Sequence, residues 1–118
     1  MYEEQIQAAT EKFAALLKEQ LTRVEGLKSQ GDFTDYAALD KIIIGVCGGD
    51  GIGPTITAQS RRVLEYLLAD EVKAGKVEFR NIDGLTIENR VKVMKAIPDD
   101  VMEELKQCHV ILKGPTHT

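Results

Sequence analysis

The stretch GGDGIGP, residues 48–54, contains the residues in this sequence best suited to holding a ligand. Four glycines, Gly48, Gly49, Gly51 and Gly53, surround Asp50. Glycine tolerates positive φ and lets a ligand or another stretch of backbone approach closely. Neither the GxGxxG spacing of dinucleotide-binding loops nor the GK[ST] ending of a P-loop is present. The stretch is therefore either a different kind of ligand loop or a turn whose glycines serve tight strand-to-helix packing.

A second candidate loop, KGPTHT, follows the apolar residues 110–112. Lys113 is either a cation that binds an anionic ligand or an exposed charge at a strand end. His109, at the start of this strand, is predicted to be structural. Cys47 and Cys108 lie far apart without CxxC spacing, so we predict buried small apolar side chains there and neither a disulfide nor a zinc site.

The elements that position both loops form a repeating strand and helix pattern. Residues 42–46 are β-branched and apolar, as expected of a central parallel strand. A helix is predicted from Pro54 to about Glu71, and a second strand runs over residues 77–82. The expected buried face of this helix comprises Ile56, Val63, Leu64, Leu67 and Leu68.

Two short helices and a third strand complete the pattern. Thr86 is predicted to cap the first helix, in which Ile87, Val91 and Met94 share a face. Pro98 begins the second, whose buried side is Val101, Met102 and Leu105, and residues 110–112 form the strand. The predicted fold class is α/β, with a partial parallel βαβαβ sheet and an extra N-terminal helix.

That extra helix spans residues 2–28. Its apolar side chains recur at three-, four- and seven-residue spacing and are Ile6, Phe13, Leu17, Leu21 and Val24. It is either an arm packed on the rest of the protein or an oligomer contact. We assign residues 1–40 to this helix and a connector, and residues 41–118 to the α/β part.

Composition and charge make some classes of binding partner unexpected. The 118 residues are 43% hydrophobic, and the net charge of −4 comes without a basic block, so nucleic acid is not an expected partner. No apolar run approaches the roughly 20 residues that span a bilayer. Glu3 and Glu4 stand where a targeting signal would be basic, and we expect a cytoplasmic protein.

The sequence resembles the β-decarboxylating dehydrogenases, the isocitrate and isopropylmalate dehydrogenase family. The resemblance covers residues 41–118 and rests on IIIGVCGGDGIGP, NIDGLTIENR, KAIPDDVMEEL and VILKGPTHT in this order. The family has a non-Rossmann α/β fold. Its members oxidise a 2-hydroxy acid with NAD or NADP and, aided by Mg²⁺ or Mn²⁺, release a carboxylate as CO₂. LKGP followed by threonine resembles the isocitrate branch.

The resemblance implies roles for four residues. Lys113 and Thr118 match positions that bind the substrate, and a cation there offsets the charge of its carboxylates. Ile52, His117 and Thr118 match positions beside the cofactor. Gly48 and Thr55 depart from the family, which commonly has proline and an acidic residue there, and His117 is not the usual residue at its position.

The family's arginine cluster, catalytic tyrosine and lysine, and metal-binding aspartates have no counterpart in these 118 residues. We therefore expect the chain alone to bind no cofactor tightly and to turn over no substrate, whether it is an N-terminal segment or part of a split enzyme. The alternative is a noncatalytic module that pairs with a fuller dehydrogenase subunit. A third interpretation is a small nucleotide or anion binder. We expect a homo-oligomer or a partner chain.

Overall fold

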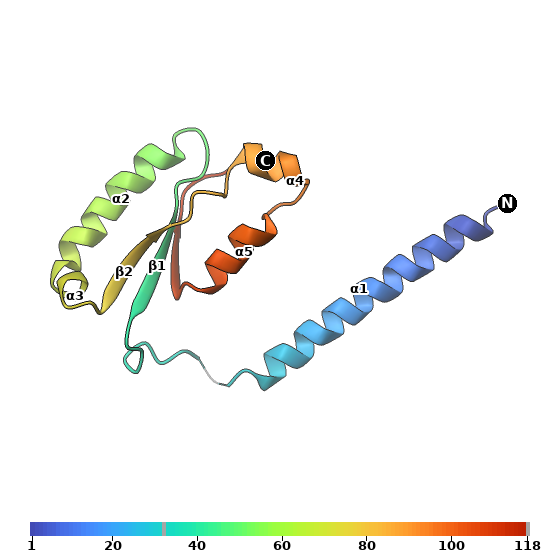
Figure 1. Cartoon of the computed structure of the whole chain (residues 1–118), viewed down its shortest axis with the longest axis horizontal. Helices are drawn as coiled ribbons and strands as arrows, with labels where there is room; N and C mark the ends of the chain where they lie inside the picture. Colours follow the sequence, from blue (N-terminus) through green and yellow to red (C-terminus); the bar gives the residue numbers. More distant parts are fainter. Residues whose placement is uncertain (32, 118) are drawn as a thin grey trace. The chain divides into compact units, whose positions relative to one another are not determined.

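The computed structural model describes residues 1–31 and 33–117 and divides the chain into two compact units, Met1–Asp35 and Tyr36–Thr118. The first unit contains one helix, α1 (Glu3–Ser29), close to its predicted range. Figure 1 shows the second unit as a sheet with helices on both sides. None of the helices among the described residues is long and apolar enough to cross a membrane.

The sheet has three parallel strands in the order β2-β1-β3. Their bounds are β1 (Ile42–Cys47), β2 (Val77–Asn81) and β3 (Val110–Lys113). The register pairs Ile44 with Phe79 of β2 and with Val110 of β3, so β1 is the central strand, as predicted. The α/β class and the parallel sheet are confirmed.

Helices α2 (Gly53–Leu67) and α3 (Ala69–Lys73) connect β1 to β2, whereas α4 (Ile87–Val93) and α5 (Asp99–Lys106) connect β2 to β3. The two pairs lie on opposite sides of the sheet (Figure 1). The prediction of one helix to Glu71 was wrong at Leu68, where φ of −105° and ψ of 16° interrupt the helix.

The predicted buried face of this helix was wrong for three of its five residues, whereas Leu64 and Leu68 are half-buried. Ile56, Val63 and Leu67 are 47%, 59% and 66% exposed. The helix instead packs through a neighbouring stripe that includes Gly53 and Thr57, both of which are buried. A Cβ on Gly53 would lie 2.2 Å from Gly48 O, so the start of α2 lies close against the glycine loop.

The core lies between the sheet and α5. Cys47, Ile82, Leu85 and Val101 form its buried cluster, with Ile97, Leu105 and Cys108 partly buried against it. Val101 is therefore buried as predicted, but Met102 is 37% exposed. The Thr86 cap is confirmed, since its hydroxyl accepts a hydrogen bond from Asn89 N.

Of the three residues predicted to share a face of this helix, Ile87 and Val91 lie within α4 and Met94 lies just beyond it; Val91 and Met94 are exposed. Met94 follows the helix as its left-handed cap, with φ of 52°. His109 is structural, as predicted: its Nδ1 accepts a hydrogen bond from Ile43 N at 3.0 Å, and its own N–H donates to Ile43 O at 2.9 Å.

Candidate functional site

The Asp50 side chain joins the glycine loop to two distant segments. The loop connects β1 to α2, and Asp50 at its centre is only 9% exposed. Its Oδ1 accepts a hydrogen bond from Ile87 N at 2.9 Å, at the start of α4. Its Oδ2 accepts one from His117 N at 3.0 Å. These two N–H donors hold the pKa of Asp50 below its ordinary range, because they stabilise the charged form.

Backbone hydrogen bonds strengthen the same junction. Asp50 N donates to Pro115 O at 2.8 Å, and Gly114 N donates to Cys47 O at 2.7 Å. The ends of β1 and β3 thus continue into two loops that are bonded to each other. Both loops lie at the carboxyl ends of parallel strands, where open α/β sheets bind their ligands.

Two glycines permit this close approach. A Cβ on Gly49 would lie 2.0 Å from Pro115 O, and Gly49 has φ of +78°. A Cβ on Gly114 would lie 2.2 Å from Gly48 O and 2.5 Å from Thr57 Oγ1. At these two positions glycine is therefore required by the close contact between the two loops.

The tip of the glycine loop is different. Ile52 is 71% exposed and lies outside the buried core cluster. A Cβ on neighbouring Gly51 would lie 3.6 Å from Nε2 of the exposed His117, so the histidine ring lies beside the loop tip. The Ile52 side chain of the glycine loop and the His117 imidazole of the loop after β3 are therefore both exposed to solvent. The hydrogen bonds of Asp50 hold the two loops in place.

Lys113 ends β3 and is exposed, but its ammonium group is not free. Its Nζ donates to Gly114 O at 3.0 Å and to Thr116 Oγ1 at 3.3 Å. The cation therefore turns back over the loop that follows its own strand. Thr118, the fourth predicted site residue, lies outside the described residues.

Arg90 of α4 also lies at the junction of the two loops, and the sequence did not predict it. Its Nε donates to Ala96 O at 2.8 Å, and its Nη1 donates to His117 O. Arg90 occurs within NIDGLTIENR, but nothing in that stretch indicates a contact with a residue 27 positions later. Only the folding of α4 over the ends of the strands brings the two together.

A small cavity of about 180 Å³ lies between these cations and the core. Its polar lining comes from Arg90, Lys113 and Thr116; its other lining residues are Cys47, Leu85, Ala96, Ile97, Leu105 and Ile111. Two cations beside an apolar floor suit an anion with a short hydrocarbon body. Burial raises the pKa of Cys47, so its thiol stays protonated at neutral pH and is no nucleophile.

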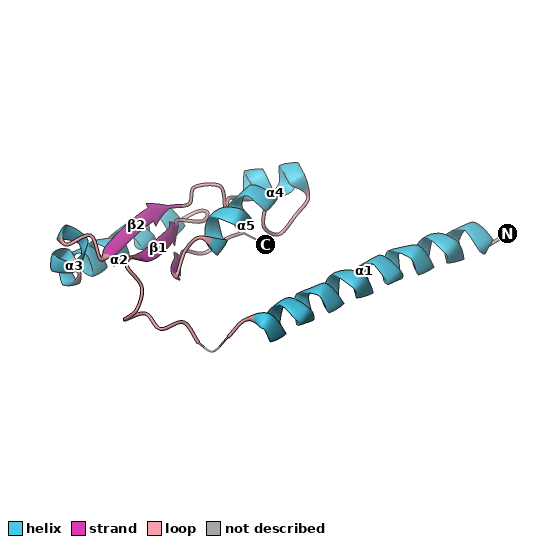
Figure 2. Cartoon of the chain, turned by 60° about the horizontal axis from the view of Figure 1, so that its bottom comes forward, coloured by secondary structure: helices cyan, strands magenta, loops and turns pink. Residues whose placement is uncertain are grey.

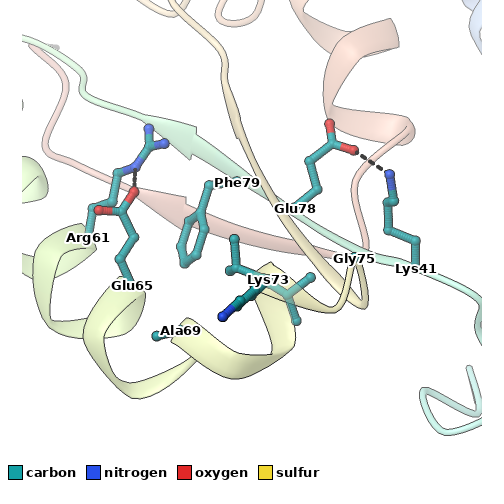
Figure 3. Close-up of a pocket in the computed structure, with 10 residues that line it drawn as sticks. Lys41, Arg61, Glu65, Ala69, Lys73, Gly75, Glu78 and Phe79 are labelled. Carbon is teal, nitrogen blue, oxygen red and sulfur yellow. Dashed lines mark hydrogen bonds and ion pairs between the residues drawn. The ribbon is translucent and has the colours of Figure 1, made fainter.

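A larger hollow of about 630 Å³ lies at the other end of the sheet (Figure 3). Arg61 stacks over the Phe79 ring at 5.3 Å and pairs with Glu65 at 2.7 Å. Lys41 pairs with Glu78 at 3.3 Å. Because these cations already have carboxylate partners and the hollow adjoins the amino ends of β1 and β2, we do not assign the site here.

The residues present do not fit a divalent metal ion. Among residues 1–31 and 33–117, no three His, Cys, Asp or Glu side chains converge as metal ligands would. Among the described residues, Asp50 brings a carboxylate to the site, and each of its oxygens accepts a hydrogen bond from a backbone N–H group. No step of chemistry is therefore assigned to a metal on these residues.

Comparison with known proteins gives one informative similarity. No family model matches the chain. No solved structure matches it. The chain is 33% identical over 75 residues to 3-isopropylmalate dehydrogenase 1 of Bradyrhizobium diazoefficiens. The matched part is 64% of this chain but 19% of that relative, so the chain spans about a fifth of the relative's length. The similarity supports a relationship to this dehydrogenase family at most and says nothing of isocitrate.

Proposed function

We propose that these residues are a segment of a β-decarboxylating dehydrogenase of the isocitrate type, in which the two joined loops form one wall of the substrate and cofactor cleft. The observation that carries this is the Asp50 carboxylate, which fastens the glycine loop to the loop after β3. That junction fixes the exposed Ile52, His117 and Lys113 at one end of the sheet.

In this proposal Lys113 and Thr118 face the substrate, a 2-hydroxy acid such as isocitrate. The ammonium group of Lys113 offsets the charge of the substrate carboxylates. Ile52, His117 and Thr118 face the nicotinamide of NAD or NADP. In the whole family enzyme, NAD or NADP would supply the hydride acceptor, and Mg²⁺ or Mn²⁺ would assist decarboxylation. The partial similarity to an isopropylmalate dehydrogenase supports the family, and LKGP followed by threonine favours isocitrate.

Binding is tested by titrating the ¹⁵N-labelled chain with isocitrate, isopropylmalate, NAD and NADP at millimolar concentrations. We expect isocitrate to shift the amide signals of Lys113 and His117, and the Lys113→Met variant to lose that response. Lys73→Met is the matched control, because Lys73 lines the hollow at the opposite end of the sheet. Equal shifts in both variants, or a response to isopropylmalate alone, contradict the assignment of isocitrate to Lys113.

Turnover is tested separately. Because no metal-ligating cluster is present among the described residues, we expect no reduced cofactor from isocitrate, Mg²⁺ and NAD or NADP above a no-protein control. Accumulation of reduced cofactor contradicts the proposal that the chain alone is inactive.

A noncatalytic pairing module is the second candidate. It is favoured by the exposed apolar stripe on α2, where Ile56, Val63 and Leu67 lie on the surface. In this case the purified chain should bind a full-length dehydrogenase subunit and alter its activity, and Val63→Ser should weaken both effects. A coding frame that runs past Thr118 into serine, asparagine and several arginines would favour the first candidate instead.

A further inference from the structure

Helix α1 carries an unbroken heptad stripe. Figure 2 shows it as one continuous helix. Seven positions alternate at four- and three-residue spacing along it: Ile6, Thr10, Phe13, Leu17, Gln20, Val24 and Leu27. This is the seam pattern of a two-stranded coiled coil, and it extends over roughly three heptads.

Five of the seven side chains in this stripe are apolar, and these five are exposed to solvent. Its five apolar members are 37–63% exposed, and no residue of α1 is buried. Leu16 and Leu21 flank it at 50% and 64% exposure. The Thr10 hydroxyl donates to Ile6 O at 2.8 Å, so this residue can face a partner with its hydrogen bond already made. A helix of this kind draws most of its stability from packing its apolar face.

We propose that α1 pairs with α1 of a second copy of this chain as an antiparallel coiled coil. With the dimer axis at residue 15, Leu17 packs against Phe13 of the second copy, and Val24 packs against Ile6. The two polar positions of the stripe, Thr10 and Gln20, then meet each other. Between residues 6 and 24, apolar residues therefore pack against apolar residues and polar residues against polar residues. This matching specifies the register.

Charge selects the antiparallel orientation. In a parallel pair, Arg23 would lie beside Lys28 of the second copy on both sides of the seam, and these like charges repel. The first half of the helix has three acids and one base (Glu3, Glu4, Glu11 and Lys12), a net charge of −2. The second half has two acids and three bases (Glu19, Glu25, Lys18, Arg23 and Lys28), a net charge of +1. The antiparallel arrangement places these opposite halves, and opposite helix dipoles, beside each other.

Sedimentation equilibrium of the full chain tests the pairing. We expect a dimer at about 100 μM protein that dissociates on dilution. Phe13→Glu places a charge in the central layers and should give a monomer, whereas Ala15→Glu adds the same charge outside the seam and should leave the dimer intact. A monomeric wild-type chain, or a dimer that survives Phe13→Glu, overturns the proposal.

A second variant tests the seam without disrupting it. Gln20→Leu replaces a polar residue of the Thr10 and Gln20 layer, so the dimer dissociation constant should fall roughly tenfold. An unchanged constant means that Gln20 does not lie in the interface and contradicts the register.

The orientation is tested by the distance between spin labels on residue 28 of the two copies (Lys28→Cys). In the antiparallel dimer the labelled positions are about 26 residues apart along the axis, or roughly 40 Å at 1.5 Å per residue. A parallel pair gives less than about 20 Å, since paired helices lie close together. The wild-type chain, labelled in the same way, corrects for reaction at Cys108.

Discussion

Asp50 illustrates how a carboxylate in a glycine-rich loop can organise a site without binding a ligand itself. It is nearly buried, and each of its oxygens accepts a backbone N–H, one from α4 and one from the loop after β3. These two hydrogen bonds favour the charged form of the carboxylate and fix the positions of both of its oxygens. Its contribution is to hold Ile52 and His117 on the same side of the sheet.

Replacing Asp50 by asparagine should loosen this junction. The amide keeps one oxygen acceptor but presents an NH₂ group toward the second N–H donor, which is then left unpaired. We expect faster hydrogen exchange at the amides of Ile87 or His117 and a lower melting temperature. Asp83→Asn, at an exposed position without the buried junction, is the matched control and should change neither.

The same carboxylate makes stability depend on pH. The pKa of Asp50 is lowered by its N–H donors, and the pKa of Glu78 is lowered by Arg80 and Lys41. Groups with a depressed pKa in the folded state stabilise the protein above their unfolded value of about 4, and this stabilisation is lost as pH falls through the folded pKa.

Urea unfolding at pH 7 and at pH 3 measures this effect. We expect a lower free energy of unfolding at pH 3. The loss should be smaller in Asp50→Asn. A carboxyl ¹³C titration of Asp50 with a midpoint at or above the ordinary aspartate value would contradict it.

The residues also show what the sequence could indicate about the site. The glycine cluster, Lys113 and His117 were visible as a pattern, and the structure brings the loops that contain them together. Arg90 could not be found in this way, because its contact with His117 O depends on where α4 lies. Similarly, Gly49 is required by the position of Pro115 O, which is distant in sequence.

At the scale of elements, helix positions were easier to predict than helix faces. The helix between the first two strands has apolar residues on more than one side, so periodicity does not identify the side that meets the sheet. In the structure the buried residues of α2 are Gly53 and Thr57, and the Arg61 guanidinium lies over the Phe79 ring of β2. Val63 and Leu67 remain exposed as a consequence.

Polar substitution on that exposed stripe should be tolerated. Val63→Ser should change the free energy of unfolding by less than about 0.5 kcal/mol, because Val63 is 59% exposed. Leu64→Ser, on the half-buried side, should cost about 1–2 kcal/mol. Urea denaturation of both variants measures the difference, and a loss in Val63→Ser as large as that in Leu64→Ser would contradict this assignment of the buried side.

Within α1, Gly26 is a helical residue with open space where a Cβ would lie, since no atom outside its own stretch of helix comes within 4 Å of that point. Gly26→Ala should therefore favour the helix by roughly 0.5–1 kcal/mol, because glycine loses more backbone entropy than alanine. Circular dichroism at 222 nm should show a more helical and more heat-resistant α1. Gly31→Ala, beyond the helix end, is the control and should leave helicity unchanged.

At the scale of the whole molecule, the core belongs to one of the two units. Val101 is fully buried against Cys47, Ile82 and Leu85, whereas α1 has no buried residue. Val101→Ala should lower the free energy of unfolding of the second unit by about 2 kcal/mol through a cavity. Val91→Ala, at a 59% exposed position, should have little effect.

The change should appear in the protection of β1 amides and not in the stability of α1. Hydrogen exchange followed by NMR distinguishes the two units. Equal loss of protection in β1 and α1 would mean that the units unfold together.

The architecture of the second unit followed from simple rules. A strand that is apolar on both faces predicts the centre of a parallel sheet, and crossovers through helices predict parallel neighbours. The order β2-β1-β3 follows from that central position, because β3 must then return to the open edge of β1. As the chain returns to the edge of β1, Val101 of α5 packs against Cys47 and Ile82.

This return also affects the order in which the protein can fold. β1 is made early, but its second row of hydrogen bonds pairs Ile44 with Val110 and Cys47 with Lys113, near the other end of the described chain. During synthesis, one edge of β1 therefore stays unpaired until β3 has emerged. Such distant pairings slow folding and leave an edge open to wrong partners. The loop that Asp50 secures therefore cannot be completed before β3 and the loop after it are in place.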